Sequence, residues 1–493
     1  MPLYRQKWFL AAGIVVAAVF LLLLYLKIQP NRGVEESTAD LASSPAVKTG
    51  ETWKSIYFAD EKIGYVRSVL KQEEKGEYIL EETVFFRFNS MGMVHDISLD
   101  TSARLQRNFS LDRFCFDMTS GLMSISVSGR VKKDHVVIET SNPGTAGKRD
   151  FRIAVDKKPY LVSGMLMDFA RSGPPFPEQK EYSLFDPATM SFSDATVSFS
   201  GKQTVSVSDE QTDALALSLS FKGFTQKIWM DENGRSLMEK GLMGMKIVGD
   251  SKSNALDGIV EKPGRDITDM AAVSFSNLIE NPENLAELKV KITGIDLSEF
   301  DIANHRQTLS GNILTIRKET LPETGDGRNN TENLKRFTEP EPFIQSDHES
   351  VIQKAREITK DAGSDLETIR RIVRWVHDNI RKTPVVTVPS ALSTLESKKG
   401  DCNEHAVLTA ALARAVDIPC TVETGLYYLN GKFRYHAWNA FYAGGWITAD
   451  AVFNQIPADV THISLTSGEA RSETALAGII GKIKLEPVKE KSR

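Results

Sequence analysis

The chain has 493 residues, and its 60 basic and 65 acidic side chains leave a net charge of −5. This length allows two or three domains, and the mild negative charge without a basic stripe excludes a nucleic-acid-binding protein. Three cysteines are too few for a fold held together by disulfides, although pairing of Cys115 with Cys420 stays open.

The first predicted element is an apolar stretch near the N-terminus. Residues 8–26 are uncharged and rich in Leu, Val, Ala and Phe, which suits a helix that crosses a bilayer. Arg5 and Lys7 precede this stretch, and no small-residue cleavage site follows closely, so we predict a retained anchor. The expected partner is thus the lipid bilayer, through residues 8–26. We expect a single-pass protein of the inner (cytoplasmic) membrane with the bulk of the chain exported, periplasmic or extracytoplasmic.

A tether and a β-rich domain are predicted next. The anchor occupies residues 1–30, and residues 31–49 have the Glu, Ser, Thr, Ala and Pro content of a flexible tether. Over residues 50–265, short strands alternate with turn residues, which predicts a curved antiparallel sheet or half-open barrel of unknown ligand or partner. Helix is scarce there, and the best candidate is 160–170. The predicted strands are 53–58, 78–88, 122–131, 135–140, 195–199, 214–221, 226–230 and 236–240.

A smaller segment over residues 266–340 follows the β-rich domain. It contains strand patterns at 285–293 and 313–317, and then a polar run over 319–336 with Pro, Gly and Asn. We interpret this segment as a β-rich spacer, or a subdomain packed on the preceding domain, followed by a linker. The last predicted domain spans residues 341–488.

Helices open this C-terminal domain. One is predicted over 346–361, and a capping box of Ser364 with Glu367 begins a second helix with an apolar face. Thr383-Pro384 closes the second helix, since proline cannot continue it.

The candidate nucleophile stands at the start of a further helix. Asp401 can cap a helix over 402–416, which places Cys402 in its first turn. The positive end of the helix dipole favours the thiolate there. The backbone N–H of Cys402 lacks a partner within the helix and can begin an oxyanion hole. No second oxyanion donor stands out between residues 390 and 399.

The candidate base follows on a predicted hairpin. Asn430-Gly431 is a strong two-residue turn signal, and His436 lies on the returning strand. A neighbouring strand can place Asp450 beside His436, where the carboxylate would hold one imidazole tautomer and favour the imidazolium.

Cys402, His436 and Asp450 thus supply a nucleophile, a base and an orienting carboxylate in this order. His405 is a rival base one helical turn beyond Cys402, with Glu404 as its only evident carboxylate partner. No paired-cysteine or helical histidine cluster indicates a metal site, and no cofactor is expected.

These motifs resemble the transglutaminase-like superfamily, whose members have a papain-like cysteine protease core. The resemblance covers residues 343–488 and implies that Cys402 is the nucleophile, His436 the general base and acid, and Asp450 the orienting carboxylate. One departure is that the family often continues with Pro-Thr after the aspartate. The motifs are Gly400-Asp401-Cys402, Ala411-Leu412-Ala413-Arg414-Ala415 with Ile418-Pro419, His436-Ala437-Trp438, and Trp446 with Asp450, which is followed by Ala451-Val452.

The expected fold class is α+β, with a single N-terminal transmembrane helix, a β-rich region and a C-terminal papain-like transglutaminase core. The resemblance implies an exported, membrane-anchored cysteine enzyme that acts on amide bonds of a peptide or protein through an acyl-thioester. Hydrolysis of peptide or isopeptide bonds is expected ahead of amine transfer to protein glutamine, which would crosslink proteins. The alternative is a noncatalytic binding or scaffold protein at the membrane surface, and a buried Cys402 would favour it.

Overall fold

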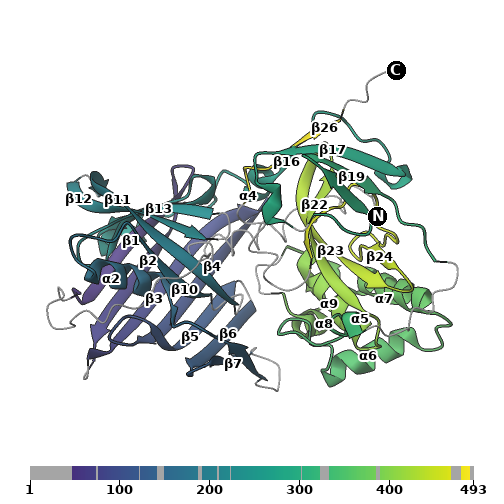
Figure 1. Cartoon of the computed structure of the whole chain (residues 1–493), viewed down its shortest axis with the longest axis horizontal. Helices are drawn as coiled ribbons and strands as arrows, with labels where there is room; N and C mark the ends of the chain where they lie inside the picture. The colour runs from purple at the N-terminus through teal and green to yellow at the C-terminus, as the bar shows by residue number, and fades with distance from the viewer. Residues whose placement is uncertain are drawn as a thin grey trace. The chain divides into compact units, whose positions relative to one another are not determined.

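The chain divides into two compact units, one ending at Asp266 and the other beginning at Ile267. Each unit is described by itself (Figure 1). The predicted anchor at residues 8–26 lies outside the described residues. Within the described ranges, every helix falls short of the length and apolar character that a membrane span needs. The computed structural model describes residues 47–73, 76–90, 92–120, 123–141, 149–186, 191–207, 210–221, 224–300, 302–322, 332–384, 389–467 and 479–488.

The expected α+β class is wrong for the described residues, and no helix among them is the expected single transmembrane helix. Among the described residues, strands hold 48% and helices only 20%, so this part of the chain is mostly β. The physical reason is that many strands of the N-terminal unit expose one face to water and are therefore rich in polar residues. Such strands give a weak hydrophobic pattern, and the sequence underestimates their number.

The N-terminal unit is built on one fifteen-stranded sheet. Its strand pairs are antiparallel except for β9 with β10, and β1 pairs with β15, so strands from both ends of the unit meet within the sheet. The predicted antiparallel sheet is therefore confirmed, and β8 and β9 are its two edges. The strands are β1 (Gly50–Phe58), β2 (Glu61–Gln72), β3 (Tyr78–Ser90), β4 (Met93–Leu105), β5 (Leu111–Ser120), β6 (Met123–Val131), β7 (His135–Ser141), β8 (Arg149–Ala154), β9 (Pro159–Tyr160), β10 (Gln179–Asp186), β11 (Ser191–Val207), β12 (Glu210–Phe221), β13 (Phe224–Met230), β14 (Ser236–Lys240) and β15 (Lys246–Asp250).

One longer helix, α2 (Val162–Arg171), packs closely against loops of this unit. A Cβ on Gly164 would lie 2.5 Å from the carbonyl oxygen of Phe109, and a Cβ on Gly234 would lie 2.8 Å from Cα of Met167. Glycine is needed at both positions because the backbones approach each other directly. The helix predicted over 160–170 is confirmed with shifted ends. The other helical segments are η3 (Leu242–Gly244) and α3 (Lys252–Leu256).

The C-terminal unit places one buried helix between a sheet and other helices (Figure 1). Helix α9 (Cys402–Arg414) contacts β22 (Cys420–Leu429) and β23 (Lys432–Tyr442) on one side, and helices α6, α7 and α8 on the other. All of its residues are buried, which explains why small and apolar residues occur all round it. The remaining helices are α4 (Ile267–Ala271), η4 (Pro282–Asn284), η5 (Leu297–Glu299), α5 (Glu332–Lys335), α6 (Glu349–Thr359), α7 (Asp365–Asn379) and α8 (Ala391–Ser397).

Three sheets complete this unit. The first runs β16-β23-β22-β25 with β24 on β23, the second runs β18-β19-β17-β26, and the third is the pair β20-β21. The bounds are β16 (Val273–Ser274), β17 (Glu287–Thr293), β18 (Gln307–Ser310), β19 (Ile313–Arg317), β20 (Arg381–Lys382), β21 (Lys399–Gly400), β24 (Trp446–Ala449), β25 (Ile463–Ser467) and β26 (Lys484–Pro487).

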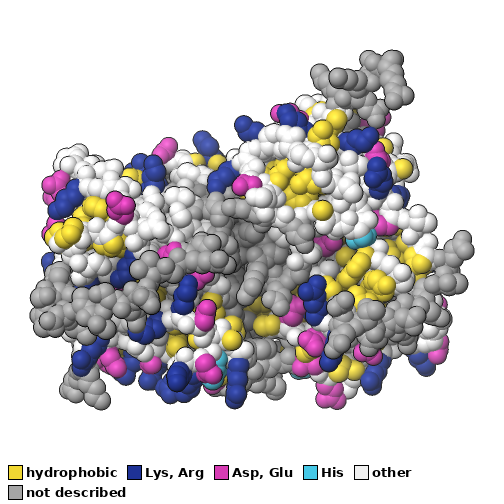
Figure 2. All heavy atoms as spheres, viewed as in Figure 1, with side chains coloured by type: hydrophobic (Ala, Val, Ile, Leu, Met, Phe, Trp, Pro, Cys, Tyr) yellow, Lys and Arg dark blue, Asp and Glu magenta, His cyan; other side chains and the backbone are white. Residues whose placement is uncertain are grey.

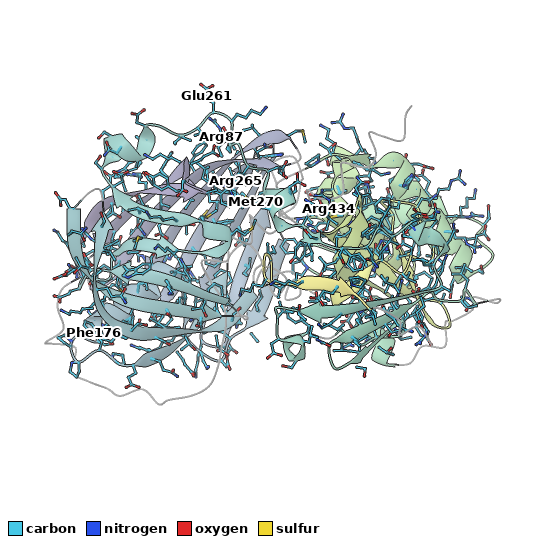
Figure 3. All side chains as sticks on the ribbon, turned by 90° about the horizontal axis from the view of Figure 1, so that it is seen from above. Arg87, Phe176, Glu261, Arg265, Met270 and Arg434 are labelled. Carbon is cyan, nitrogen blue, oxygen red and sulfur yellow. The ribbon has the colours of Figure 1, made fainter. Side chains whose placement is uncertain are left out.

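The segment after residue 266 belongs to the C-terminal unit. Val273 of β16 pairs with Phe433 of β23, and Arg434, labelled in Figure 3, forms an ion pair with Asp269 at 2.9 Å. Strand β17 also pairs with β26 near the end of the chain. These pairings join the described part of the segment predicted as a spacer or subdomain to strands of the C-terminal domain.

The distribution of surface charge and the state of the cysteines agree with what the composition indicated. Basic and acidic side chains are interspersed on the visible face of the described residues (Figure 2). Cys115, Cys402 and Cys420 are all free, so the open question of a Cys115–Cys420 disulfide is answered in the negative.

Candidate active site

Cys402 stands at the first position of α9, and the cap of this helix is complete. The carboxylate of Asp401 accepts from the backbone N–H of Asn403 at 2.9 Å, and Glu404 accepts from the backbone N–H of Asp401 at 3.0 Å. This reciprocal capping box confirms Asp401 as the N-cap. The backbone N–H of Cys402 has no acceptor in the part of the chain that the structure describes. It is therefore available to a developing oxyanion.

The predicted hairpin brings His436 to the same place. Asn430 and Gly431 adopt left-handed φ angles of 50° and 84°, and they join β22 to β23 as the turn signal indicated. Helix α9 packs on β23, and the side-chain amide of Asn439 donates to the carbonyl of Ala406 at 2.9 Å. The backbone N–H of Ala437 interacts with the Cys402 sulfur, so the thiol lies next to the residue that follows His436.

Asp450 lies directly after β24 and contacts His436. Its Oδ2 is 2.8 Å from Nε2 of His436, and its Oδ1 accepts from the backbone N–H of Val452 at 2.7 Å. Nε2 of His436 therefore carries a proton, which leaves the lone pair of the neutral ring on Nδ1. Nδ1 is buried and has no hydrogen-bond partner among the described residues. This is the tautomer that a base facing a thiol requires.

The electrostatics keep Asp450 ionised. Burial alone would raise the pKa of Asp450, but the imidazoles of His436 and His462, which donate hydrogen bonds to its carboxylate, hold that pKa well below its usual range. Asp450 is 0% exposed, and it can remain a carboxylate because its oxygens accept from imidazole and backbone N–H groups.

The pKa of Cys402 differs from the one that its position at a helix start predicts. Burial raises the pKa of the Cys402 thiol well above its usual value, and the Asp401 carboxylate raises it further. The N–H of Ala437 opposes this shift but does not outweigh it. With 1% of Cys402 exposed, the desolvation of a thiolate exceeds the stabilisation from the helix dipole. The resting side chain is a neutral thiol.

His405 is in a different situation from His436. Its Nδ1 lies 2.5 Å from the backbone carbonyl oxygen of Asp401, and its Nε2 has no partner among the described residues. Burial lowers the pKa of His405 to about 4, so the ring is neutral at physiological pH. Because this ring hydrogen-bonds to the backbone of the N-cap and has no carboxylate partner among the described residues, it is poorly suited as the base.

A second histidine, His462, contacts the same aspartate, and sequence reasoning missed it. Its Nε2 is 3.1 Å from Oδ2 of Asp450, and its Nδ1 is 3.2 Å from the carbonyl oxygen of Asp459. The Asp459 carboxylate, at 3.4 Å, also faces this Nδ1. A histidine twelve residues after the candidate carboxylate was visible in the sequence, but nothing local indicated that the chain turns back there.

Two histidines and one aspartate lie close enough together here to be candidate ligands of one metal ion. His436, Asp450 and His462 each place one candidate ligand atom within 4.8 Å of the others. However, both nitrogens of His462 face oxygen acceptors and therefore carry protons, so the ring offers no lone pair to a metal. We interpret the cluster as a hydrogen-bonded network.

Buried polar residues from the segment after residue 266 support this network. Arg306 donates to the backbone carbonyls of Ala458 at 3.0 Å and Asp459 at 2.8 Å. The side chain of Gln307 donates to the carbonyl of Ser464 at 2.8 Å and accepts from its N–H at 2.7 Å. The segment predicted as a spacer therefore holds the loop that carries His462.

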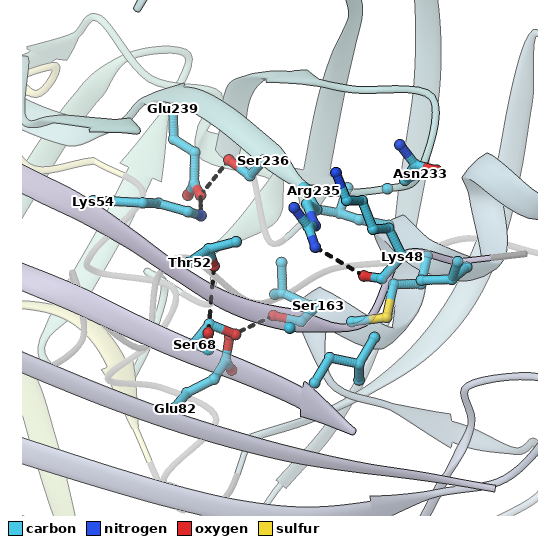
Figure 4. A pocket seen from close by; sticks show the side chains of 17 residues that line it. Lys48, Thr52, Lys54, Ser68, Glu82, Ser163, Asn233, Arg235, Ser236 and Glu239 are labelled. Atoms are coloured by element: carbon cyan, nitrogen blue, oxygen red, sulfur yellow. Dashed lines mark hydrogen bonds and ion pairs between the residues drawn. The ribbon is translucent and has the colours of Figure 1, made fainter. Parts of the chain in front are cut away.

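The N-terminal unit has a hollow of its own (Figure 4). Lys54 pairs with Glu239 at 2.8 Å, and Ser163 donates to Glu82 at 2.7 Å. Because these polar side chains bind one another, the hollow does not indicate the chemistry of a ligand. Its lining residues are Val47, Lys48, Gly50, Thr52, Lys54, Ser68, Leu70, Glu82, Val162, Ser163, Leu166, Met167, Asn233, Gly234, Arg235, Ser236 and Glu239.

Comparison with known proteins gives one match in sequence. Residues 352–451 match the model of the transglutaminase-like superfamily. This range includes Cys402, His436 and Asp450 but ends before His462. No curated protein matches the chain.

Among solved structures, similarity is loose. A candidate cysteine protease from Cytophaga hutchinsonii shares 17% identity over 40% of this chain and 83% of its own, with a TM-score of 0.28. A β-barrel-like protein of unknown function from Brucella abortus shares 10% identity over 42% and 97%, with a TM-score of 0.32. A candidate protease from Parabacteroides distasonis shares 12% identity over 67% and 64%, with a TM-score of 0.19. Overlaps this loose carry no argument about function.

Proposed function

We propose that this chain, which carries a transglutaminase-like domain over residues 352–451, hydrolyses amide bonds of a peptide or protein through an acyl-thioester. One observation carries this proposal. The His436 ring has Nε2 bound to Asp450 and Nδ1 without a partner among the described residues, and the Cys402 sulfur interacts with the N–H of the adjacent Ala437. A held base beside a thiol is the minimum that thiol catalysis requires.

The reaction would proceed in two halves. Nδ1 of His436 takes the proton of Cys402 as the sulfur attacks the amide carbonyl carbon, and the N–H of Cys402 stabilises the oxyanion. The C–N bond breaks, the amine leaves with the proton from His436, and a thioester remains. Water, deprotonated by His436, then attacks the thioester and releases the acid and the thiol.

Hydrolysis is proposed over amine transfer because the candidate nucleophile is buried. The site holds Cys402 with 1% of its surface exposed. Once the acyl part of the substrate occupies the access to this sulfur, water reaches the thioester more readily than an amine attached to a second protein, which would need a further opening.

The test compares two products in one reaction. The full chain is incubated with a mixture of unfolded proteins and a biotin-labelled primary amine. New amino termini are then counted by mass spectrometry, and incorporated biotin is measured by blotting. We expect new termini and no biotin, and we expect Cys402→Ala to abolish the termini while the fold is retained. Cys420→Ala is the matched control, because Cys420 is also buried but has no imidazole partner among the described residues. Biotin without new termini would favour amine transfer.

One observation favours a second function. Cys402 is buried and its pKa is raised, as a noncatalytic scaffold would allow. In that case the domain would bind a partner without turnover. Alkylation of Cys402 by a small neutral reagent discriminates between the two, because a scaffold thiol would show no dependence on His436.

A further inference from the structure

One oxygen of Asp450 is shared by two imidazole rings. Its Oδ2 lies 2.8 Å from Nε2 of His436 and 3.1 Å from Nε2 of His462. Nδ1 of His462 faces two acceptors, the carbonyl and carboxylate oxygens of Asp459, at 3.2 Å and 3.4 Å. A ring whose two nitrogens both face acceptors carries two protons, so His462 is an imidazolium.

We propose that His462 is a positioning residue that holds Asp450 and, through its positive charge, keeps the resting Cys402–His436 pair as neutral thiol and neutral imidazole. The inference rests on the proposed function, since it assigns a role relative to that catalytic pair. The inference holds whether water or an amine attacks the thioester.

The positioning role follows from the loop that carries His462. Asp459 accepts from the backbone N–H of Thr461 at 2.8 Å, and Arg306 binds the carbonyl of Asp459 at 2.8 Å. Gly425 of β22 lets β25 approach closely, because a Cβ there would lie 1.9 Å from the carbonyl oxygen of Ile463. The ring of His462 is therefore held from its own loop, from β22 and from the segment after residue 266.

The charge role follows from the groups that face the ring. Two carboxylates, Asp450 and Asp459, contact it. The phenol ring of Tyr427 lies 4.6 Å away and the indole of Trp438 lies 5.1 Å away, and both are neutral. His436 is a further titratable neighbour, with its ring centre 5.7 Å from that of His462.

Proton transfer within the catalytic pair breaks the S–H bond of Cys402 and forms an N–H bond at Nδ1 of His436. It creates a second imidazolium 5.7 Å from the first, inside a buried site. Repulsion between the two charges disfavours that state. The raised pKa of the Cys402 thiol is consistent with a neutral resting pair. The proton then moves only as the sulfur attacks a carbonyl.

The first test is the pH profile of alkylation of Cys402. The full chain is treated with iodoacetamide between about pH 5 and pH 9, and the modified Cys402 peptide is quantified by mass spectrometry. The variant His462→Gln keeps a donor toward Asp450 but has no charge. In this variant, we expect the midpoint of the Cys402 alkylation profile to move to lower pH by about one unit or more. The reason is that the repulsion between the two imidazolium charges is removed. His305→Gln is the matched control, since His305 faces Glu319 rather than Asp450 and should leave the midpoint in place.

The outcomes separate the two proposals. A profile that does not change in His436→Ala would overturn the proposed function, and with it this inference. A profile that depends on His436 but is the same in His462→Gln, or moves to higher pH, would overturn this inference alone.

The second test uses the wild-type protein and needs no variant. In protein labelled with nitrogen-15 histidine, NMR at about pH 7.5 should show two ring N–H protons for His462, since its pKa lies well above that pH. The signals are assigned through contacts with the Trp438 indole, 5.1 Å away. A single ring N–H would show a neutral His462 and overturn the inference.

Discussion

Replacing Asp450 with Asn tests the arrangement of the site most directly. In the structure, Oδ1 of Asp450 accepts from the N–H of Val452 at 2.7 Å, and Oδ2 accepts from His436 at 2.8 Å and His462 at 3.1 Å. An asparagine that keeps its oxygen on Val452 turns its NH₂ group toward both histidines. His436 must then accept at Nε2, which moves its proton to Nδ1, toward Cys402. The base becomes a donor.

The size of the effect can be worked from these contacts. The charge-assisted hydrogen bond with His462 is lost, and the one with His436 is exchanged for a neutral one. With about 1.5–3 kcal/mol for a charge-assisted bond and about 0.5–1.5 kcal/mol for a neutral one, the free energy of unfolding should fall by about 3 kcal/mol. Because domains are stable by about 5–15 kcal/mol, Asp450→Asn should fold but melt at least about 6 °C lower. Turnover should fall about 10⁴-fold, the scale of such a change in a catalytic triad.

The assay is the rate of Cys402 alkylation at about pH 7 together with a thermal melt. The matched control is Glu423→Gln, a buried carboxylate on β22 that accepts from the indole N–H of Trp438 at 2.9 Å, outside the network. Its amide oxygen can keep that bond, so the alkylation rate should stay within about twofold. If Asp450→Asn matched the wild type in both rate and melting temperature, the assigned contacts between Asp450 and the histidines would be refuted.

Three further predictions concern stability. Gly425→Ala should lower the free energy of unfolding by about 3 kcal/mol in chemical denaturation, because its Cβ would lie 1.9 Å from the carbonyl oxygen of Ile463; an unchanged midpoint would contradict this packing. Ser364→Ala should cost about 1 kcal/mol by the same assay, because it removes the cap on the N–H of Glu367, and Ser364→Thr should restore it. The pKa of His462 is raised from 6.5 to about 9, so its stabilisation is full below pH 6.5 and is lost as the pH rises through about 9. The free energy of unfolding should fall by on the order of 3 kcal/mol over this window, and His462→Gln should remove the slope.

The local features of the site were predictable from the sequence. The N-cap at Asp401 and the turn at Asn430-Gly431 depend on residues within a few positions of each other, and both occur as predicted. Each signal reflects a short-range need, a free helix N–H or a left-handed φ angle, that few residue types can meet. The contact of His436 with Asp450 follows from the same reasoning, because strands joined by tight turns lie side by side.

Only the tertiary structure decided the rest. His462 and Arg306 reach the site through loop packing and a segment far earlier in the chain, and no local pattern encodes such an approach. The state of Cys402 also depends on burial: the sequence puts it at a helix start, which favours the thiolate, whereas the surrounding sheet and helices exclude water and favour the thiol. Desolvation is a property of all the neighbours together, and the sequence near Cys402 determines only one of them.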